Sequence, residues 1–397
     1  MIEITREAEA KGSEVSPKVE KRDIQIDDLF RIKFLNSPEI SPDGRKIAFT
    51  YKWTDLKENT YYSSLYVADV ESGVVTPFTR GEKQDSRPRW SPDGKSILFR
   101  GDRDKKKGLW ILPADGGEAG PLMTDKGALG EYVWSPDGKK VAFTFREAPD
   151  PIPLRHISND PEYKATDEDR PYEILEKVPF KTTGGELLTG LRFHIYLLDV
   201  ETGKKEQLTQ EDFDDGSLAF SPDGRALAFC SNRSEDPIRD YEHNDIYVLD
   251  PGTRKVRKVT NHWGPKNAPT WSPDGRFIYF AGHRAPRGKG GPEDVRIYRI
   301  PSGGGEPVLI TQDFQGYVGN LIVGDTREFD VIVEPFVFPK GGDSLLFSAS
   351  HEGGCFLYEV PRDGGKPVRI EEGQHEIAAC SVDRQGENMA VLRGDFL

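Results

Sequence analysis

The residue types that could support nucleophilic hydrolysis do not form a recognised arrangement in this sequence. A serine nucleophile often lies in Gly-x-Ser-x-Gly, on a sharp turn between a strand and a helix, and this pattern is absent from the 397 residues. Gly342-Asp343-Ser344-Leu345 matches another short nucleophile motif, but it occupies the same repeat position as Gly94-Lys95-Ser96-Ile97. A short motif means little outside its strand–loop–helix context. We therefore predict that no residue here is catalytic and that the chain alone is not an enzyme.

The histidines and cysteines lack the spacing of a metal site. No two histidines have the separation of a helix-borne zinc pair, and no Cys-x-x-Cys occurs. The glycine-rich stretch 288–290 lacks the serine or threonine of a phosphate-binding loop. We therefore expect no metal and no cofactor. One alternative stays open, because repeats around an axis can bring distant histidines together. The seven histidines are His156, His194, His243, His262, His283, His351 and His375.

A tetrapeptide repeat organises the chain. Ser-Pro-Asp-Gly is followed each time by Lys or Arg and then by an apolar run, and two degenerate copies continue the series at Gly342 and Gly386. Proline fixes φ at the first turn position, aspartate bonds to nearby backbone, and glycine accepts the left-handed conformation that closes the turn. The repeat therefore predicts a series of seven β-hairpins. The five full copies are 41–44, 91–94, 135–138, 221–224 and 272–275.

A second half-motif follows six of the seven copies. It begins with an aliphatic residue and an aromatic one, and it predicts another hairpin. Two hairpins make a four-stranded sheet that cannot bury its faces alone, so such sheets stack around an axis. We predict an all-β fold, a seven-bladed β-propeller with four-stranded antiparallel blades and an incomplete last blade. A sandwich or barrel also shows regular turns, but five identical tetrapeptides argue against it. The half-motifs begin at 65–66, 109–110, 195–196, 246–247, 297–298 and 357–358.

The repeats assign nearly the whole chain to one domain. We place an N-terminal extension with a short helix at 1–36 and the propeller at 37–397. The helix is expected over 27–35, with Asp27 as its N-cap. The third blade carries an insertion at about 149–190. Long excursions in compact repeats are commonly functional, so we expect this one to bind or to contact a domain, although surface insertions are also tolerated.

Composition and charge exclude several classes of partner. The net charge of −13 disfavours sequence-independent binding to nucleic acid. No apolar run reaches the length that crosses a membrane, and the N-terminus lacks the apolar core of a signal peptide. We therefore expect a cytoplasmic protein without nucleic-acid or membrane partners.

The repeats resemble those of TolB-like propellers, and the flanking segments narrow the resemblance. Asp27-Asp28-Leu29-Phe30, with Ser37-Pro-Glu-Ile-Ser-Pro-Asp-Gly-Arg-Lys-Ile-Ala-Phe49, is similar to the opening segment of acylaminoacyl peptidases and dipeptidyl aminopeptidases in the prolyl oligopeptidase family. Tyr172-Glu-Ile-Leu-Glu-Lys-Val-Pro-Phe180 and Ser231-Asn-Arg-Ser-Glu-Asp-Pro237 are similar to it as well. The resemblance covers about residues 24–397.

This resemblance implies the propeller of a serine peptidase, a part that would restrict access to an α/β-hydrolase domain. No position here matches the hydrolase domain or its catalytic triad. The implied function is a non-catalytic gate for short or N-acylated peptides. Its implied partner is a C-terminal or separately encoded hydrolase domain. Two alternatives remain, a stand-alone TolB-like scaffold that binds proteins and a metal-dependent propeller lyase.

Four side chains are candidates for the gate. Arg87, Arg89, Glu131 and Tyr132 precede Ser-Pro-Asp-Gly turns, which places them on innermost strands near the tunnel or its rim. Their charges could select peptide termini by ion pairing. The same residues could instead form a solvated lining of the tunnel.

Overall fold

Strands make up nearly all of the regular structure. The computed structural model describes residues 23, 25–103, 106–148, 191–237, 240, 243–262, 264–284, 294–322 and 335–395. Within these ranges a 3-10 helix, η1 (Ile26–Phe30), precedes the first strand, and all the other regular elements are strands. The predicted all-β class is confirmed. No helix in the described part is both long and apolar enough to cross a membrane.

The strands follow the chain in groups of four antiparallel neighbours, and a hairpin comes last. The first two groups are β1 (Lys33–Ile40), β2 (Lys46–Asp55), β3 (Thr60–Asp69), β4 (Val75–Pro77), and β5 (Gln84–Trp90), β6 (Ser96–Arg103), β7 (Lys106–Pro113), β8 (Gly120–Met123). The third and fourth are β9 (Gly127–Trp134), β10 (Lys140–Glu147), β11 (His194–Asp199), β12 (Lys205–Gln207), and β13 (Asp215–Phe220), β14 (Leu227–Ser231), β15 (Asp245–Leu249), β16 (Val256–Lys258). The last are β17 (Lys266–Trp271), β18 (Phe277–Gly282), β19 (Arg296–Pro301), β20 (Val308–Leu309), then β21 (Tyr317–Val318), β22 (Ser344–His351), β23 (Gly354–Pro361), β24 (Val368–Arg369), and the hairpin β25 (His375–Val382) and β26 (Met389–Asp395).

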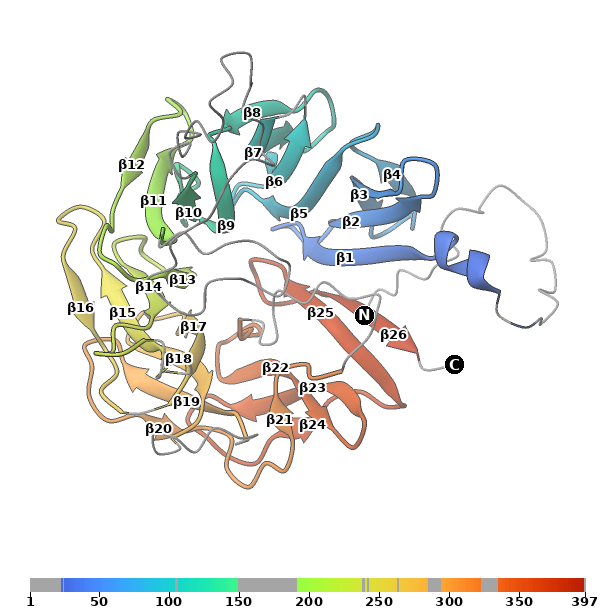
Figure 1. Cartoon of the computed structure of the whole chain (residues 1–397). Helices are drawn as coiled ribbons and strands as arrows, with labels where there is room; N and C mark the ends of the chain where they lie inside the picture. Colours follow the sequence, from blue (N-terminus) through green and yellow to red (C-terminus); the bar gives the residue numbers. More distant parts are fainter. Residues whose placement is uncertain are drawn as a thin grey trace, which may run out of the picture.

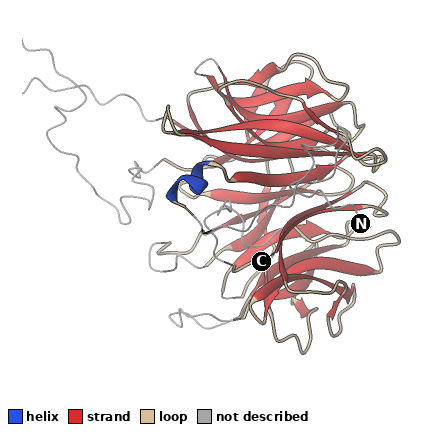
Figure 2. Cartoon of the chain, turned by 90° about the vertical axis from the view of Figure 1, so that its right-hand side faces the viewer, coloured by secondary structure: helices blue, strands red, loops and turns tan. Residues whose placement is uncertain are grey.

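The groups lie around a common centre, from the blue β1 to the red β26 in Figure 1. One parallel pairing, of Ser63 with Gln84, joins the sheets of the first and second groups, and another, of Cys355 with Glu376, joins the sheet of the sixth group to the hairpin. Figure 2 shows the same strands from the side, with η1 next to them. The fold is therefore propeller-like, with four-stranded antiparallel sheets. The count of seven blades and the incomplete last blade stay predictions.

Each full Ser-Pro-Asp-Gly turn contains the same hydrogen bonds. In the second copy the Ser91 hydroxyl donates to Asp93 Oδ1 over 2.6 Å and accepts from the Ser96 N–H over 3.0 Å. Gly94 has a φ of +71°, and its N–H donates to the Ser91 carbonyl over 2.8 Å. Glycine adopts this left-handed backbone at little steric cost. The turn residues therefore close each hairpin between its first and second strands, as predicted.

Tryptophans that precede the turns connect neighbouring groups. Nε1 of Trp90 donates to the Glu39 carbonyl over 2.9 Å, and Nε1 of Trp134 donates to the Arg89 carbonyl over 3.2 Å. Trp271 makes the same bond to the Ala219 carbonyl over 3.0 Å. Every acceptor lies two residues before the serine of the preceding full turn. The repeat thus carries its own inter-group contact.

The N-terminal region differs from the prediction. The first strand begins at Lys33, before the expected boundary at residue 37, because residues 33–36 pair with residues 50–53 of β2. The expected helix over 27–35 is therefore reduced to η1, and Phe34 lies in a strand. The N-cap is Gln25, whose N–H donates to Asp28 Oδ2 over 2.8 Å, and not Asp27. Residues 1–22 and the insertion at 149–190 lie outside the described residues.

Candidate functional site

The inner strands contain β-bulges close to the centre of the fold. In β5 the register with β6 shifts between Ser86 and Arg89, and Arg87 has a φ of +54°. Ser37 and Ser217 take the same left-handed conformation in β1 and β13. A bulge interrupts the ladder and leaves backbone groups that need other partners. Side chains of neighbouring groups supply these partners.

Glu131 and Tyr132 of β9 bind the bulges on either side of them. The Glu131 carboxylate accepts hydrogen bonds from the N–H groups of Ser217 and Leu218, the latter over 3.0 Å. The Tyr132 hydroxyl donates to the Arg87 carbonyl. Burial raises the pKa of Glu131, against the opposing effect of those two N–H groups and of the arginine charges. Burial also raises the pKa of Tyr132 to about 12.

Arg89 of β5 makes the next contact between inner strands, with Glu39 of β1. One of its guanidinium nitrogens, Nη1, is 3.2 Å from Glu39 Oε2 of β1. Its carbonyl accepts from the Trp134 indole, as described above. Both side chains of this ion pair are partly exposed, at 37% for Arg89 and 25% for Glu39. The pair therefore remains accessible to a charged ligand.

The structure thus brings the four predicted residues into one chain of contacts from β1 to β13. Glu131 and Tyr132 hold the backbone of adjacent groups, which gives them a structural role that sequence reasoning did not assign. Their contacts join positions that are 45 and 86–87 residues apart. A role for Arg87, Arg89, Glu131 and Tyr132 in gating stays a prediction.

An axial cavity of about 340 Å³ lies at the end of the fold where the Ser-Pro-Asp-Gly turns meet. Ligand pockets commonly have volumes of this order. Arg384 closes part of it, because its Nη1 lies 3.3 Å from the Pro92 carbonyl. Sequence reasoning missed these residues, although four of them are the repeated proline of the turn. The lining comprises Glu39, Ile40, Pro42, Trp90, Pro92, Pro136, Pro222, Val382 and Arg384.

Two other kinds of site were expected to be absent, a metal site and a serine nucleophile. Within the described ranges, no group of three or more His, Cys, Asp or Glu side chains is arranged to hold a metal ion. Ser344, the serine of the short nucleophile motif, begins β22 and donates to Glu359 Oε1 over 2.5 Å. It pairs with Pro361 as Ser96 pairs with Pro113. The two serines therefore occupy equivalent positions in the repeat.

One family model covers most of the chain. The model of the TolB beta propeller domain, PD40, matches residues 27–160 and 188–332, which is more than half of the chain. The chain belongs to the TolB β-propeller family. The matched ranges of this TolB propeller include the described strands from β1 to β21, while β22 to β26 follow them in the sequence.

Relatives of this TolB propeller include peptidases. It is 24% identical to dipeptidyl-peptidase 5 of Porphyromonas gingivalis over 378 residues, which cover 90% of this chain and 50% of that protein. The chain spans between about a third and a half of the length of the first curated relatives it matches.

Solved structures give the same picture of the fold. An acylaminoacyl peptidase in complex with Z-Gly-Gly-Phe-chloromethyl ketone aligns with a TM-score of 0.67 and 18% identity, over 92% of this chain and 50% of that one. The β-propeller domain of the trilobed protease from Pyrococcus furiosus aligns with a TM-score of 0.57 and 17% identity, over 92% of this chain and 90% of that one. The propeller domain therefore resembles those of acylaminoacyl-peptidase-like peptidases.

Proposed function

We propose that this chain is the non-catalytic propeller of a serine peptidase similar to acylaminoacyl peptidases. In this proposal the propeller controls the access of short or N-acylated peptides to an α/β-hydrolase domain. That domain follows on the same polypeptide or is encoded separately. The observation that carries the proposal is the match to dipeptidyl-peptidase 5, which covers nine-tenths of this chain but only half of that enzyme.

We also propose how many blades the propeller has and where in the cell the protein acts. The propeller has seven blades, and its last blade is incomplete. The protein acts in the cytoplasm and binds no nucleic acid. Arg89 and Glu39 lie in or next to the axial cavity with opposite charges, so they can contact a peptide's carboxylate and ammonium ends.

Labelling with a fluorophosphonate probe, which reacts with activated serines, tests the absence of catalysis in this chain. We expect no stoichiometric labelling of the isolated chain, whereas the hydrolase partner from the source cells is labelled. A Ser344→Ala variant is the matched control. Stoichiometric labelling that this substitution abolishes would make Ser344 a nucleophile and would overturn the proposal.

Membership in the TolB family also favours a second candidate, a stand-alone scaffold that binds proteins. The two candidates differ in what accompanies the chain in its source cells. A peptidase propeller is recovered with a fluorophosphonate-reactive hydrolase domain, on the same polypeptide or in a complex. A scaffold is recovered with other proteins and with no such activity.

A further inference from the structure

The Ser-Pro-Asp-Gly turns place a series of proline side chains around the axial cavity. The proline of each full turn lies next to the glycine of the following turn. A Cβ atom added to Gly94 would lie 3.7 Å from Pro42 Cδ, and one added to Gly138 would lie 3.4 Å from Pro92 Cδ. Proline has an apolar, rigid ring and no backbone N–H. Much of the cavity lining is therefore apolar and offers no hydrogen-bond donor. Its prolines are Pro42, Pro92, Pro136 and Pro222.

Arg384 occupies the proline position in the turn between β25 and β26. This degenerate turn spans residues 383–386, and its last N–H donates to its first carbonyl over 3.1 Å, as in the full turns. Arg384 lines the axial cavity together with the prolines. Its backbone N–H donates to the Pro42 carbonyl over 3.3 Å, and its Nη1 donates to the Pro92 carbonyl over 3.3 Å. The arginine thus places a cation where the full turns have an apolar ring.

The acidic groups closest to Arg384 in the cavity and in its own turn are bound elsewhere. The Asp383 carboxylate accepts three backbone N–H groups from residues that follow it in the turn. Glu39, the acidic residue of the cavity lining, lies 3.2 Å from Arg89. Within the described ranges no carboxylate forms an ion pair with the exposed guanidinium of Arg384. Its charge is therefore available to an anionic ligand.

Lys340 shows that a cation at the proline position is not enough to make such a site. It is the second residue of the other degenerate turn, 339–342, whose last N–H donates to its first carbonyl over 2.9 Å. The ammonium group of Lys340 forms an ion pair with Glu387. The lining of the axial cavity does not include Lys340. Arg384 therefore differs from Lys340 both in its place at the cavity and in its lack of a carboxylate partner among the described residues.

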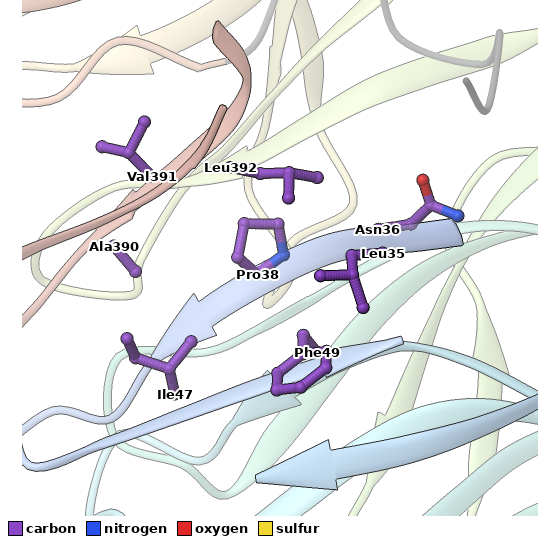
Figure 3. Close-up of a pocket in the computed structure, with 8 residues that line it drawn as sticks. All are labelled: Leu35, Asn36, Pro38, Ile47, Phe49, Ala390, Val391 and Leu392. Carbon is purple, nitrogen blue, oxygen red and sulfur yellow. The ribbon is translucent and has the colours of Figure 1, made fainter. Parts of the chain in front are cut away.

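A second pocket lacks a charge of this kind. It lies between β26 and the first two strands, as Figure 3 shows, and its only polar side chain is that of Asn36. A carboxylate buried there would have no cationic partner in the lining, and burial of an unpaired charge is costly. An anionic ligand therefore favours the axial cavity over this pocket. The lining comprises Leu35, Asn36, Pro38, Ile47, Phe49, Ala390, Val391 and Leu392.

We propose that the axial cavity binds the C-terminal end of a peptide whose last residue is apolar. The terminal carboxylate pairs with the guanidinium of Arg384, and the last side chain packs on the proline rings. Arg384 keeps Nε and Nη2 as donors, since its side chain bonds to the described residues through Nη1. A guanidinium and a carboxylate can form two parallel hydrogen bonds, and partial exclusion of water strengthens such bonds.

This site goes beyond the residues of the peptidase proposal. Arg89 already has Glu39 as its partner, so a ligand carboxylate must compete for it. Arg384 requires no such competition. A peptidase propeller and a protein-binding scaffold can both use the site, so its test is independent of whether a hydrolase accompanies the chain.

A pair of peptides tests the role of the carboxylate. N-acetyl-Ala-Ala-Phe with a free carboxylate is compared with the same peptide as its C-terminal amide, by isothermal titration calorimetry on the full chain. We expect saturable binding of the acid and at least about tenfold weaker binding of the amide, which loses the charge-assisted bonds. Equal affinities, or no saturable binding of the acid at millimolar concentration, would overturn the proposal. So would displacement of the acid by an equal concentration of acetate, because the site would then bind any small anion.

Two matched variants of the chain locate the site. Arg384→Gln should weaken binding of the acid at least about tenfold, to the level of the amide. Lys340→Gln should leave it unchanged, although it removes a cation from the equivalent turn position. Binding of the acid that persists unchanged in Arg384→Gln would contradict the assignment.

A third variant keeps the location testable if Arg384→Gln does not fold. Pro222 is exposed and lines the cavity without forming part of the arginine turn. Pro222→Glu places a negative charge in the cavity, so it should weaken binding of the acid several-fold and change that of the amide less. An unchanged affinity for the acid would show that the peptide binds outside the cavity and would overturn the proposal.

Discussion

Lys266 Nζ lies 3.1 Å from Asp245 Oδ1, and both side chains are almost completely buried. Lys266 lies at the start of the inner strand β17. At the equivalent position the second group has Asp85, which pairs with Arg103, and the fourth group has Asp215, which pairs with Arg233. The fifth group thus reverses the charges of a repeated ion pair. Asp245 comes from β15 of the preceding group, so the reversed pair connects two groups instead of lying within one.

Removing the buried cation should destabilise the fold strongly. We expect Lys266→Met to lower the free energy of unfolding by roughly 3 kcal/mol, because the buried Asp245 carboxylate loses its buried cation and keeps, among the described residues, the partly exposed Lys258 and the imidazole of His243. The double variant Lys266→Met with Asp245→Asn should recover part of this loss. Urea unfolding measures both. A double variant less stable than Lys266→Met alone would contradict this interpretation.

The tryptophan contacts predict a difference between two similar substitutions. Trp90 and Trp110 are both buried, but Trp90 Nε1 has a backbone acceptor, and Trp110 Nε1 has none among the described residues. Trp90→Phe removes the hydrogen bond to the Glu39 carbonyl, so we expect it to cost about 0.5–1.5 kcal/mol more than Trp110→Phe. Equal losses in denaturant unfolding would show that the indole bond does not stabilise the contact between groups.

Two glycines with the same backbone conformation distinguish the cost of backbone strain from the cost of steric crowding around an added Cβ atom. Gly44 and Gly73 have φ values of +73° and +69°. An added Cβ would lie 2.6 Å from Asn388 Nδ2 at Gly44 and would meet nothing within 4 Å at Gly73. Both alanine variants should lose about 1 kcal/mol from the left-handed backbone, and Gly44→Ala should lose more. If Gly44→Ala were no less stable than Gly73→Ala in thermal unfolding, the β25–β26 turn would not pack on the first turn.

The Ser-Pro-Asp-Gly turns predict a pH-dependent effect. The Ser91 hydroxyl lowers the pKa of Asp93, so this bond stabilises the folded state above the unfolded carboxyl pKa of about 3.9. The stabilisation is lost as the pH falls through the lower folded value. Ser91→Ala should therefore destabilise the chain more at pH 7 than near pH 3. A difference in unfolding free energy that stays the same at both pH values would contradict the assignment.

The local parts of the fold could be predicted from the sequence because their causes are local. Proline, aspartate and glycine define each turn within four residues, and the turn at Ser91 has the expected hydrogen bonds. The predicted start of the first strand is wrong, because Leu29, Phe30 and Phe34 have a spacing that also fits a helix. Pairing with β2, which is a tertiary contact, places Phe34 in a strand.

The polar contacts of the candidate site could not be predicted, because they join distant positions. Sequence reasoning placed Glu131 near the centre, but its partners Ser217 and Leu218 lie 86–87 residues away across the insertion. One feature of the sequence could have indicated the reversed ion pair of Lys266 and Asp245. The residue six positions after the threonine of the half-motif is acidic in Asp85 and Asp215 and basic in Lys266.

The intact mass of the polypeptide that carries this sequence in its source cells tests the central claim most directly. A peptidase propeller predicts either a mass well above the 44.5 kDa of this chain, with a hydrolase domain on the same polypeptide, or a tight complex with a fluorophosphonate-reactive hydrolase. A mass of 44.5 kDa without any such partner would contradict the account and would favour the scaffold.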